Sequence, residues 1–298
     1  MKADLHCHTR LSDGSLGIED IILLASRSGV DTIAITDHDC QAGTVRGKII
    51  GKRHNINVIP GVELSSFWSD ENKNISILCY LADNPNRLEG LCRKNSLARR
   101  KASQLMIVKA CKRFPISSEL VLKCASGSTN IYKQHIMHAL IECGYTTEIY
   151  GDLYHELFDP DSLVNILVQP KYPEPKEVID AIHEAGGVAI LAHPGSDDLI
   201  PYIDKLVEFG LDGVEVWTPG NSPEQVAELL DIAKKKKLLK TGGSDFRGLY
   251  NMEPNTLGSY ETPEENYNAL VSYQAKLRRA RKKADAQKAA ELTATINN

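Results

Sequence analysis

Near its start the chain reads Asp4-Leu5-His6-Cys7-His8-Thr9-Arg10-Leu11-Ser12-Asp13, and this stretch decides how the fold is interpreted. Side chains two positions apart on an extended strand point to the same face, so His6 and His8 can converge on one metal ion. Asp13, on the next loop, is available as a third ligand. Alone the pair is weak evidence, because nine histidines in 298 residues make one His-x-His unsurprising. Its weight depends on the residues at the ends of the other strands.

Short apolar runs alternate with amphipathic segments along most of the chain. The amphipathic segments have helical spacing, and several begin with proline or acidic residues, as helices do. Such alternation predicts a parallel sheet, closed or open. The further strands are expected at 31–36, 56–63, 75–80, 187–191, 213–216 and 238–241, and the helices at 16–28, 175–185, 200–209 and 223–237.

Two parts of the chain depart from this alternation. From about residue 86 to 172 the strand pattern disappears and the sequence becomes helix-like and locally basic, which predicts a helical insertion. The stretch 264–298 is rich in helix formers and carries a run of basic residues at 278–283. We expect a solvated helix there in preference to a nucleic-acid patch.

Composition excludes several classes of protein. A net charge of -4 argues against a protein that coats nucleic acid, so no nucleic acid beyond short oligonucleotides is expected as a partner. The seven cysteines occur singly, without a Cys-x-x-Cys pair, which fits reduced thiols in a cytosol. The start of the chain has no apolar signal region, and the sequence contains no long apolar span. A cytoplasmic protein without membrane contact is expected, and the oligomeric state stays open.

Metal-binding residue types gather where the expected strands end. The carboxyl ends of parallel strands meet on one face of an αβ barrel, so these motifs are expected to form one site. Imidazoles and carboxylates without thiolates suit Zn, Mn or Fe, and a carboxylate such as Glu63 or Asp245 can bridge two ions. A multinuclear centre is the natural inference. The strand-end motifs are Thr36-Asp37-His38-Asp39, Gly61-Val62-Glu63, Ala192-His193-Pro194-Gly195 and Gly242-Gly243-Ser244-Asp245-Phe246-Arg247-Gly248.

These motifs, together with Asp4–Thr9 and Ser12-Asp13-Gly14, resemble the successive motifs of the PHP family, the polymerase and histidinol phosphatase superfamily of phosphoesterases. The resemblance implies a distorted (β/α)7 barrel with a helical insertion, whose rim holds two or three divalent metal ions. The implied units are a barrel over 1–85 and 173–263, an insertion over 86–172 and a C-terminal tail over 264–298. The chain is most similar to the branch that includes nucleoside 3′,5′-bisphosphate phosphatases with 5′-end exoribonuclease activity, AMP phosphatases and a cyclic phosphoribosyl phosphodiesterase.

The resemblance also implies a ligand set. His6, His8, Glu63 and Asp245 match the ligands of one ion, and Glu63 bridges to a second ion that His193 also binds. Asp13 and His38 match ligands of a third ion.

Two positions depart from the branch, because Ser76 and Arg247 stand where it commonly has histidines. Serine is a poor ligand and the guanidinium of arginine stays protonated, so we expect weaker metal binding at one of the last two sites.

Five further residues are candidates for substrate binding. Arg247, a permanent cation beside the centre, either grips a phosphate bidentately or is a relic without effect. The insertion carries Arg99, Arg100, Lys133 and His135 at positions that match basic motifs of the branch. Cations facing a metal centre would hold a second, nonreacting phosphate. The alternative, that they are solvated residues on an exposed helix face, stays open.

The expected reaction is hydrolysis of a small phosphorylated metabolite, foremost a nucleotide such as a nucleoside 3′,5′-bisphosphate or AMP. Metal ions would lower the pKa of water to give hydroxide and would neutralise the phosphoryl oxygens. His193 and Asp245 are the expected catalytic residues, and either His193 or water would protonate the leaving group. Two alternatives stay open: a phosphodiesterase acting on a cyclic phosphate or short RNA, and a metal-depleted protein that binds a nucleotide without turnover.

Overall fold

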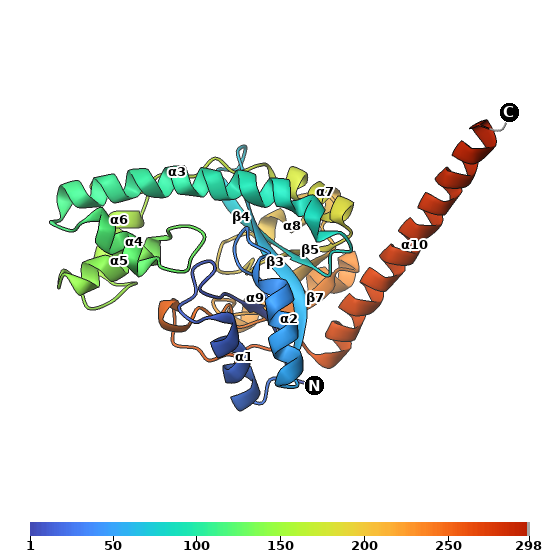
Figure 1. Cartoon of the computed structure of the whole chain (residues 1–298), viewed down its shortest axis with the longest axis horizontal. Helices are drawn as coiled ribbons and strands as arrows, with labels where there is room; N and C mark the ends of the chain where they lie inside the picture. Colours follow the sequence, from blue (N-terminus) through green and yellow to red (C-terminus); the bar gives the residue numbers. More distant parts are fainter. Residues whose placement is uncertain (297–298) are drawn as a thin grey trace.

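The computed structural model describes residues 1–296, with the side chains of the last helix described through residue 283 and at residue 286. One seven-stranded sheet, with its strands in chain order, forms the centre of the molecule (Figure 1). Neighbouring strands run parallel except β4, which is antiparallel to both β3 and β5. The strands are β1 Ala3–Cys7, β2 Thr32–Ile35, β3 Asn57–Trp68, β4 Lys73–Tyr80, β5 Val188–Leu191, β6 Gly213–Trp217 and β7 Leu239–Gly242.

The two edges of the sheet approach each other, as in a distorted (β/α)7 barrel. A parallel bridge joins Cys7 to Phe246, and the Phe246 carbonyl accepts a hydrogen bond of 2.9 Å from the backbone N–H of His8. Side chains from β1 to β5 form one buried cluster inside the curved sheet, which is filled and not hollow. Its members are Ala3, Leu5, Ala34, Ile59, Leu78, Tyr80, Val188, Ile190 and Ala192 together with Leu270.

The prediction of an all-parallel sheet is wrong for β4. The expected third strand stops at residue 63, whereas β3 continues to Trp68 and pairs there with Lys73. Only residues 69–72 connect the two strands, and so short a connection can only return the chain antiparallel, whereas a parallel neighbour needs a long crossover.

Helices cover the outer face of the sheet, and one of them escapes the sequence pattern. α2 was not expected because it contains Gly43, Gly47 and Gly51, and glycine is a poor helix former. A Cβ at Gly51 would lie 2.6 Å from the Ile56 carbonyl oxygen, so the glycines let α2 lie close to β3. The covering elements are α1 Ile18–Arg27, α2 Gly43–Arg53, α7 Pro175–Ala185, η2 Ile200–Tyr202, α8 Ile203–Glu208, α9 Pro223–Lys236 and η3 Gly248–Tyr250.

The segment between β4 and α7 is helical and has a hydrophobic cluster of its own, which includes Met106, Ile136 and Leu157. In Figure 1 these helices extend to one side of the sheet. A loop of the segment is fastened beside β1, where Thr129 donates a backbone hydrogen bond of 2.9 Å to the Leu11 carbonyl. The elements are η1 Pro85–Leu88, α3 Glu89–Arg113, α4 Ser118–Cys124, α5 Lys133–Glu142 and α6 Asp152–Phe158.

The last helix, α10, spans Glu264–Ile296, and the end of the predicted tail at 297–298 lies outside the described residues. Its first turns are not solvated as expected, since Leu270 is fully buried and packs with Tyr267 and Tyr273 against the inner cluster. Leu277 continues this packing, and Arg278 and Arg281 lie 3.4 Å and 3.7 Å from carboxylate oxygens of Asp83. The end of the helix projects away from the body of the molecule (Figure 1). Within the described part of the chain, no helix is long and apolar enough to cross a membrane.

Candidate metal centre

Four side chains, three of them buried, converge where β1 and β7 end and beside the middle of β3. His6 Nε2 lies 3.1 Å from His8 Nε2, 3.2 Å from Glu63 Oε2 and 3.2 Å from Asp245 Oδ1. His8 Nε2 lies 3.1 Å from each of the same two carboxylate oxygens. Ligand atoms that share one ion at about 2.0–2.2 Å are separated from one another by about 3.0–3.5 Å. The four atoms therefore have the spacing of a metal-ligand set, and we call this group the imidazole–carboxylate cluster.

An irregularity in β1 turns its histidines toward this cluster. The pairing of β1 with β2 shifts between Asp4 and Cys7. Leu5 belongs to the inner cluster, whereas Cys7 packs in the outer cluster that contains α1, although strict alternation would place both on one face. A bulge of this kind redirects the side chains beyond it, so that Cys7 faces outward and the histidines on either side of it, His6 and His8, both face the centre.

The other strand ends turn sharply. Asp39, His193 and Asp245 have φ values of 50°, 29° and 48°, in the left-handed region that few residues other than glycine adopt. Strained backbone of this kind persists where the surroundings enforce it, commonly at functional sites.

Glu215 on β6 fixes the orientation of His6, and the strand-end pattern did not point to it. His6 Nδ1 donates to Glu215 Oε1 at 3.0 Å, and the backbone N–H of His193 donates to Glu215 Oε2 at 2.9 Å. A proton on Nδ1 leaves a lone pair on Nε2, which points to the cluster. The sequence feature that could have pointed to Glu215 is a carboxylate inside an otherwise apolar buried strand, Gly213–Trp217.

A second group shares His8 with the first and adds Asp13 and His38. His8 Nδ1 is 3.3 Å from Asp13 Oδ1, and His38 Nε2 is 3.7 Å from Asp13 Oδ2. His38 also reaches Glu63, whose Oε2 is 3.4 Å from His38 Nδ1. Burial lowers the pKa of His38 to about 4, so near neutral pH its ring is neutral and offers a lone pair on one nitrogen.

The charge of the cluster fits divalent cations. Burial alone would raise the pKa of Glu63, but the neighbouring imidazoles, His38 foremost, hold it well below its usual range. Within the described part of the chain, Glu63 Oε1 and Asp245 Oδ1 are buried without a hydrogen bond. Buried carboxylate oxygens are normally paired, so oxygens left free beside imidazole lone pairs suit a metal ion.

His193 lies on the other side of Glu63. Its Nε2 is 3.5 Å from Glu63 Oε1, and its Nδ1 is 3.0 Å from Asp197 Oδ2. Burial would lower the pKa of His193, but Asp197 and Glu63 raise it well above its usual value.

Ser76, one of the two departures from the branch, pairs with Ser65 across the β3–β4 ladder.

Arg247 is enclosed by carboxylates. Its Nε donates to Asp13 Oδ2 at 2.8 Å, and its Nη1 donates to Asp245 Oδ2. Burial would raise the pKa of Asp13, but Arg247, followed by His38 and His8, lowers it below its usual range. The donors that were expected to grip a phosphate thus already face acidic partners.

The insertion residues take different roles. Arg99 pairs with Asp39 Oδ2 at 3.2 Å and lies 4.7 Å from the centroid of the Tyr132 ring, which itself stacks on His38 at 5.8 Å. Lys133 lies over the Phe158 ring at 5.6 Å, and burial lowers its pKa. Arg100 is exposed on α3.

His135 is buried, and its Nδ1 accepts the backbone N–H of Tyr132 at 3.1 Å, which caps the start of α5. These contacts connect the insertion to the centre through Tyr132.

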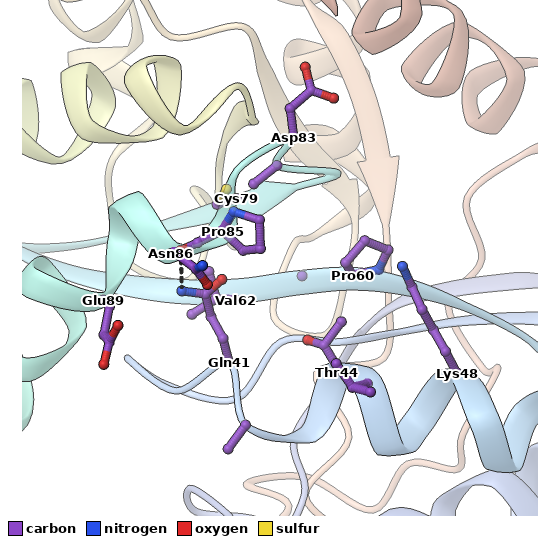
Figure 2. A pocket seen from close by; sticks show the side chains of 14 residues that line it. Gln41, Thr44, Lys48, Pro60, Val62, Cys79, Asp83, Pro85, Asn86 and Glu89 are labelled. Atoms are coloured by element: carbon purple, nitrogen blue, oxygen red, sulfur yellow. Dashed lines mark hydrogen bonds between the residues drawn. The ribbon is translucent and has the colours of Figure 1, made fainter.

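A cavity of about 530 Å³ lies elsewhere, between α2, β3 and η1. Figure 2 shows Lys48, Pro60 and Asp83 around it. No residue of the imidazole–carboxylate cluster lines this cavity.

The chain matches one family model and several known proteins over more than half of its length. The model of the PHP domain family matches residues 4–187. The chain is 32% identical over 260 residues to a phosphoribosyl 1,2-cyclic phosphate 1,2-diphosphodiesterase from Eggerthella lenta, covering 86% of this chain and 97% of the relative. It is 32% identical over 254 residues to the 5′–3′ exoribonuclease Rnm of Salmonella typhimurium, covering 82% of this chain and 84% of the relative.

A solved structure from Bifidobacterium adolescentis, assigned as a metal-dependent phosphoesterase, superposes with a TM-score of 0.80 at 29% identity. The match covers 91% of this chain and 95% of that one.

Proposed function

The chain belongs to the PHP domain family of metal-dependent phosphoesterases, and we propose that it hydrolyses a phosphate ester of a small ribose-containing metabolite, with a nucleotide as the first candidate. The observation that carries the proposal is the imidazole–carboxylate cluster, in which atoms of His6, His8, Glu63 and Asp245 lie within 4.8 Å of one another. Thiolates are absent from this ligand set, so Mn, Zn and Fe are the expected metals.

We assign the first divalent ion to the four residues of the cluster. Glu63 Oε1 and His193 Nε2, 3.5 Å apart, would hold a second ion. When bound, such ions act as Lewis acids toward phosphoryl oxygens and lower the pKa of water. The described residues orient these ligands, since Glu215 holds His6 and Asp197 holds His193.

Substrate would approach from the side where the centre is exposed. The side chains of His6, His8 and Glu63 are fully buried, whereas those of His38, His193 and Asp245 are 12%, 15% and 20% exposed. His193 would either bind an ion with Glu63 or give a proton to the leaving oxygen, and Asp197 supports both roles.

The basic residues of the insertion would recognise the part of the substrate that does not react. Arg99 lies over the ring of Tyr132, which stacks on His38. Lys133 lies over the ring of Phe158, and Arg100 is exposed on α3. Arg99 and Lys133 are partly desolvated, so they attract a second phosphate more strongly than surface cations would.

A cyclic ribose phosphate is the second candidate substrate. It is favoured by the relative from Eggerthella lenta, named for a phosphoribosyl cyclic phosphate, which this chain matches over 97% of that relative's length. A 5′-phosphorylated short RNA is the third, favoured by the exoribonuclease relative. All three contain a phosphorylated ribose.

The test is a substrate panel on the full chain with product release followed by chromatography. The panel holds a nucleoside 3′,5′-bisphosphate, AMP, a ribose cyclic phosphate and a 5′-phosphorylated oligoribonucleotide. We expect turnover of at least one, loss of turnover on exhaustive chelation and recovery with Mn or Zn. The variant Glu63→Gln should be inactive, and the matched surface variant Glu19→Gln should equal the wild type. Turnover that survives chelation, or that persists in Glu63→Gln, would refute the proposal.

A further inference from the structure

Arg247 connects the two groups of candidate ligands. Its Nε lies 2.8 Å from Asp13 Oδ2, its Nη1 contacts Asp245 Oδ2, and its Nη2 lies 3.4 Å from His8 Nε2. The side chain is only 14% exposed. A guanidinium therefore lies between a carboxylate of the first group and a carboxylate of the second, where it touches both.

The hydrogen bonds of Asp13 show why its contact with Arg247 excludes a metal ion. Asp13 Oδ2 accepts from Arg247 Nε and from Gln134 Nε2, at 2.8 Å and 3.3 Å. Asp13 Oδ1 lies 3.3 Å from both His8 Nδ1 and Ser12 Oγ. A carboxylate oxygen has about two lone-pair sites, so the oxygen of Asp13 that faces His38 is already filled by donors. A metal ion at Asp13 Oδ2 would have to displace Arg247.

Displacement is opposed by charge as well as by geometry. The guanidinium of arginine stays protonated in proteins, and it cannot turn into a ligand as histidine can. A divalent ion between Asp13 and His38 would lie close to this fixed cation in a buried site, where like charges repel strongly. Asp245 is held from the opposite side by the same fork, so Arg247 cannot withdraw without losing two carboxylate partners.

We propose that the guanidinium of Arg247 takes the place of a third divalent ion, so that the centre binds two ions per chain and Arg247 supplies the remaining positive charge. This inference rests on the proposed metal centre. Asp13 then anchors Arg247, and His38 contacts the centre through Glu63 without binding an ion of its own. The positive charge at this position is then present whether or not metal ions are bound.

Metal counting on the full chain tests the proposal. The wild type, Arg247→His and the surface control Arg27→His are loaded with excess Mn²⁺, desalted and measured by elemental analysis. We expect two ions per chain for the wild type and the control, and three for Arg247→His, because a neutral imidazole adds a nitrogen ligand beside Asp13 and His38. Three ions in the wild type, or two in a folded Arg247→His, would overturn the proposal. A wild type that binds no ion would overturn the proposed centre itself, and this inference with it.

A second variant covers the case in which Arg247→His does not fold. Arg247→Ala removes the fixed cation and leaves Asp13 and His38 as ligands. Calorimetric titration with Mn²⁺ should then show a third binding event, weaker than the first two, which millimolar guanidinium suppresses. A two-site isotherm in Arg247→Ala that is unchanged by guanidinium would contradict the replacement of an ion by Arg247.

Discussion

Replacing Glu215 with glutamine should weaken metal binding while leaving the size of the side chain unchanged. Glu215 accepts two hydrogen bonds, from His6 Nδ1 at 3.0 Å and from the backbone N–H of His193 at 2.9 Å. Glutamine offers one acceptor and one donor group in place of two acceptors. The backbone N–H cannot change, so the amide oxygen should stay with His193 and the amide NH₂ should face His6. His6 must then present a lone pair on Nδ1 and carry its proton on Nε2, where the ion would bind.

The size of the effect can be derived from the role of Glu215. Loss of a partner that orients a metal ligand typically costs 10–100-fold in affinity. This corresponds to about 1.4–2.7 kcal/mol of binding free energy. The upper part of the range is expected here, because Glu215 and His6 are both fully buried.

Calorimetric titration of Mn²⁺ into the metal-free full chain measures this loss directly. Glu228→Gln, an exposed position on α9, makes the same chemical change away from the site and should match the wild type. Circular dichroism of the apo proteins confirms that Glu215→Gln folds. An affinity within twofold of the wild type in a folded Glu215→Gln would refute the orienting role of Glu215.

Two further predictions concern stability. Gly51→Ala should lower the free energy of unfolding by about 1–3 kcal/mol, because the new Cβ meets the Ile56 carbonyl oxygen at 2.6 Å. The control is Gly90→Ala on α3, where a Cβ meets nothing within 4 Å. This control should be neutral or should stabilise the protein by up to about 1 kcal/mol. Equal effects of both in urea denaturation would contradict the close packing of α2. Burial lowers the pKa of His135 to about 4, so between pH 6.5 and 4 the unfolded chain binds a proton that the folded chain does not, and stability rises with pH through this window. His135→Gln should reduce the stability difference between pH 4.5 and pH 7 by about 2–3 kcal/mol, and an unchanged difference would show that His135 does not contribute it.

The residues of the metal centre could be predicted because their signal is local. His6, His38, His193 and Asp245 each stand at or just beyond the end of an apolar run, and the topology of such a fold brings those ends together. Glu215 was missed for a related reason. It lies within a strand and not at its end, so a pattern of metal-binding residues at strand ends does not include it. Its partner His6 is more than two hundred residues away in the sequence.

Features that depend on close packing could not be predicted. The hairpin after Trp68 turns β4 antiparallel, although its residues read like those of the other strands. The glycines of α2 suggest a loop until their contact with β3 is known. The acidic partners of Arg247 lie 234 residues away and two residues away, and only the folded chain shows that they enclose the guanidinium.

His6, His8, Glu63 and Asp245 are expected to hold a divalent ion. Anomalous diffraction at the manganese edge, from crystals of the full chain grown with Mn²⁺, tests it most directly. We predict an anomalous peak at about 2.0–2.2 Å from His6 Nε2 and His8 Nε2, in contact with both carboxylates, and a second peak between Glu63 and His193. The absence of a peak among these four side chains, in crystals that bind Mn²⁺ elsewhere, would contradict the claim.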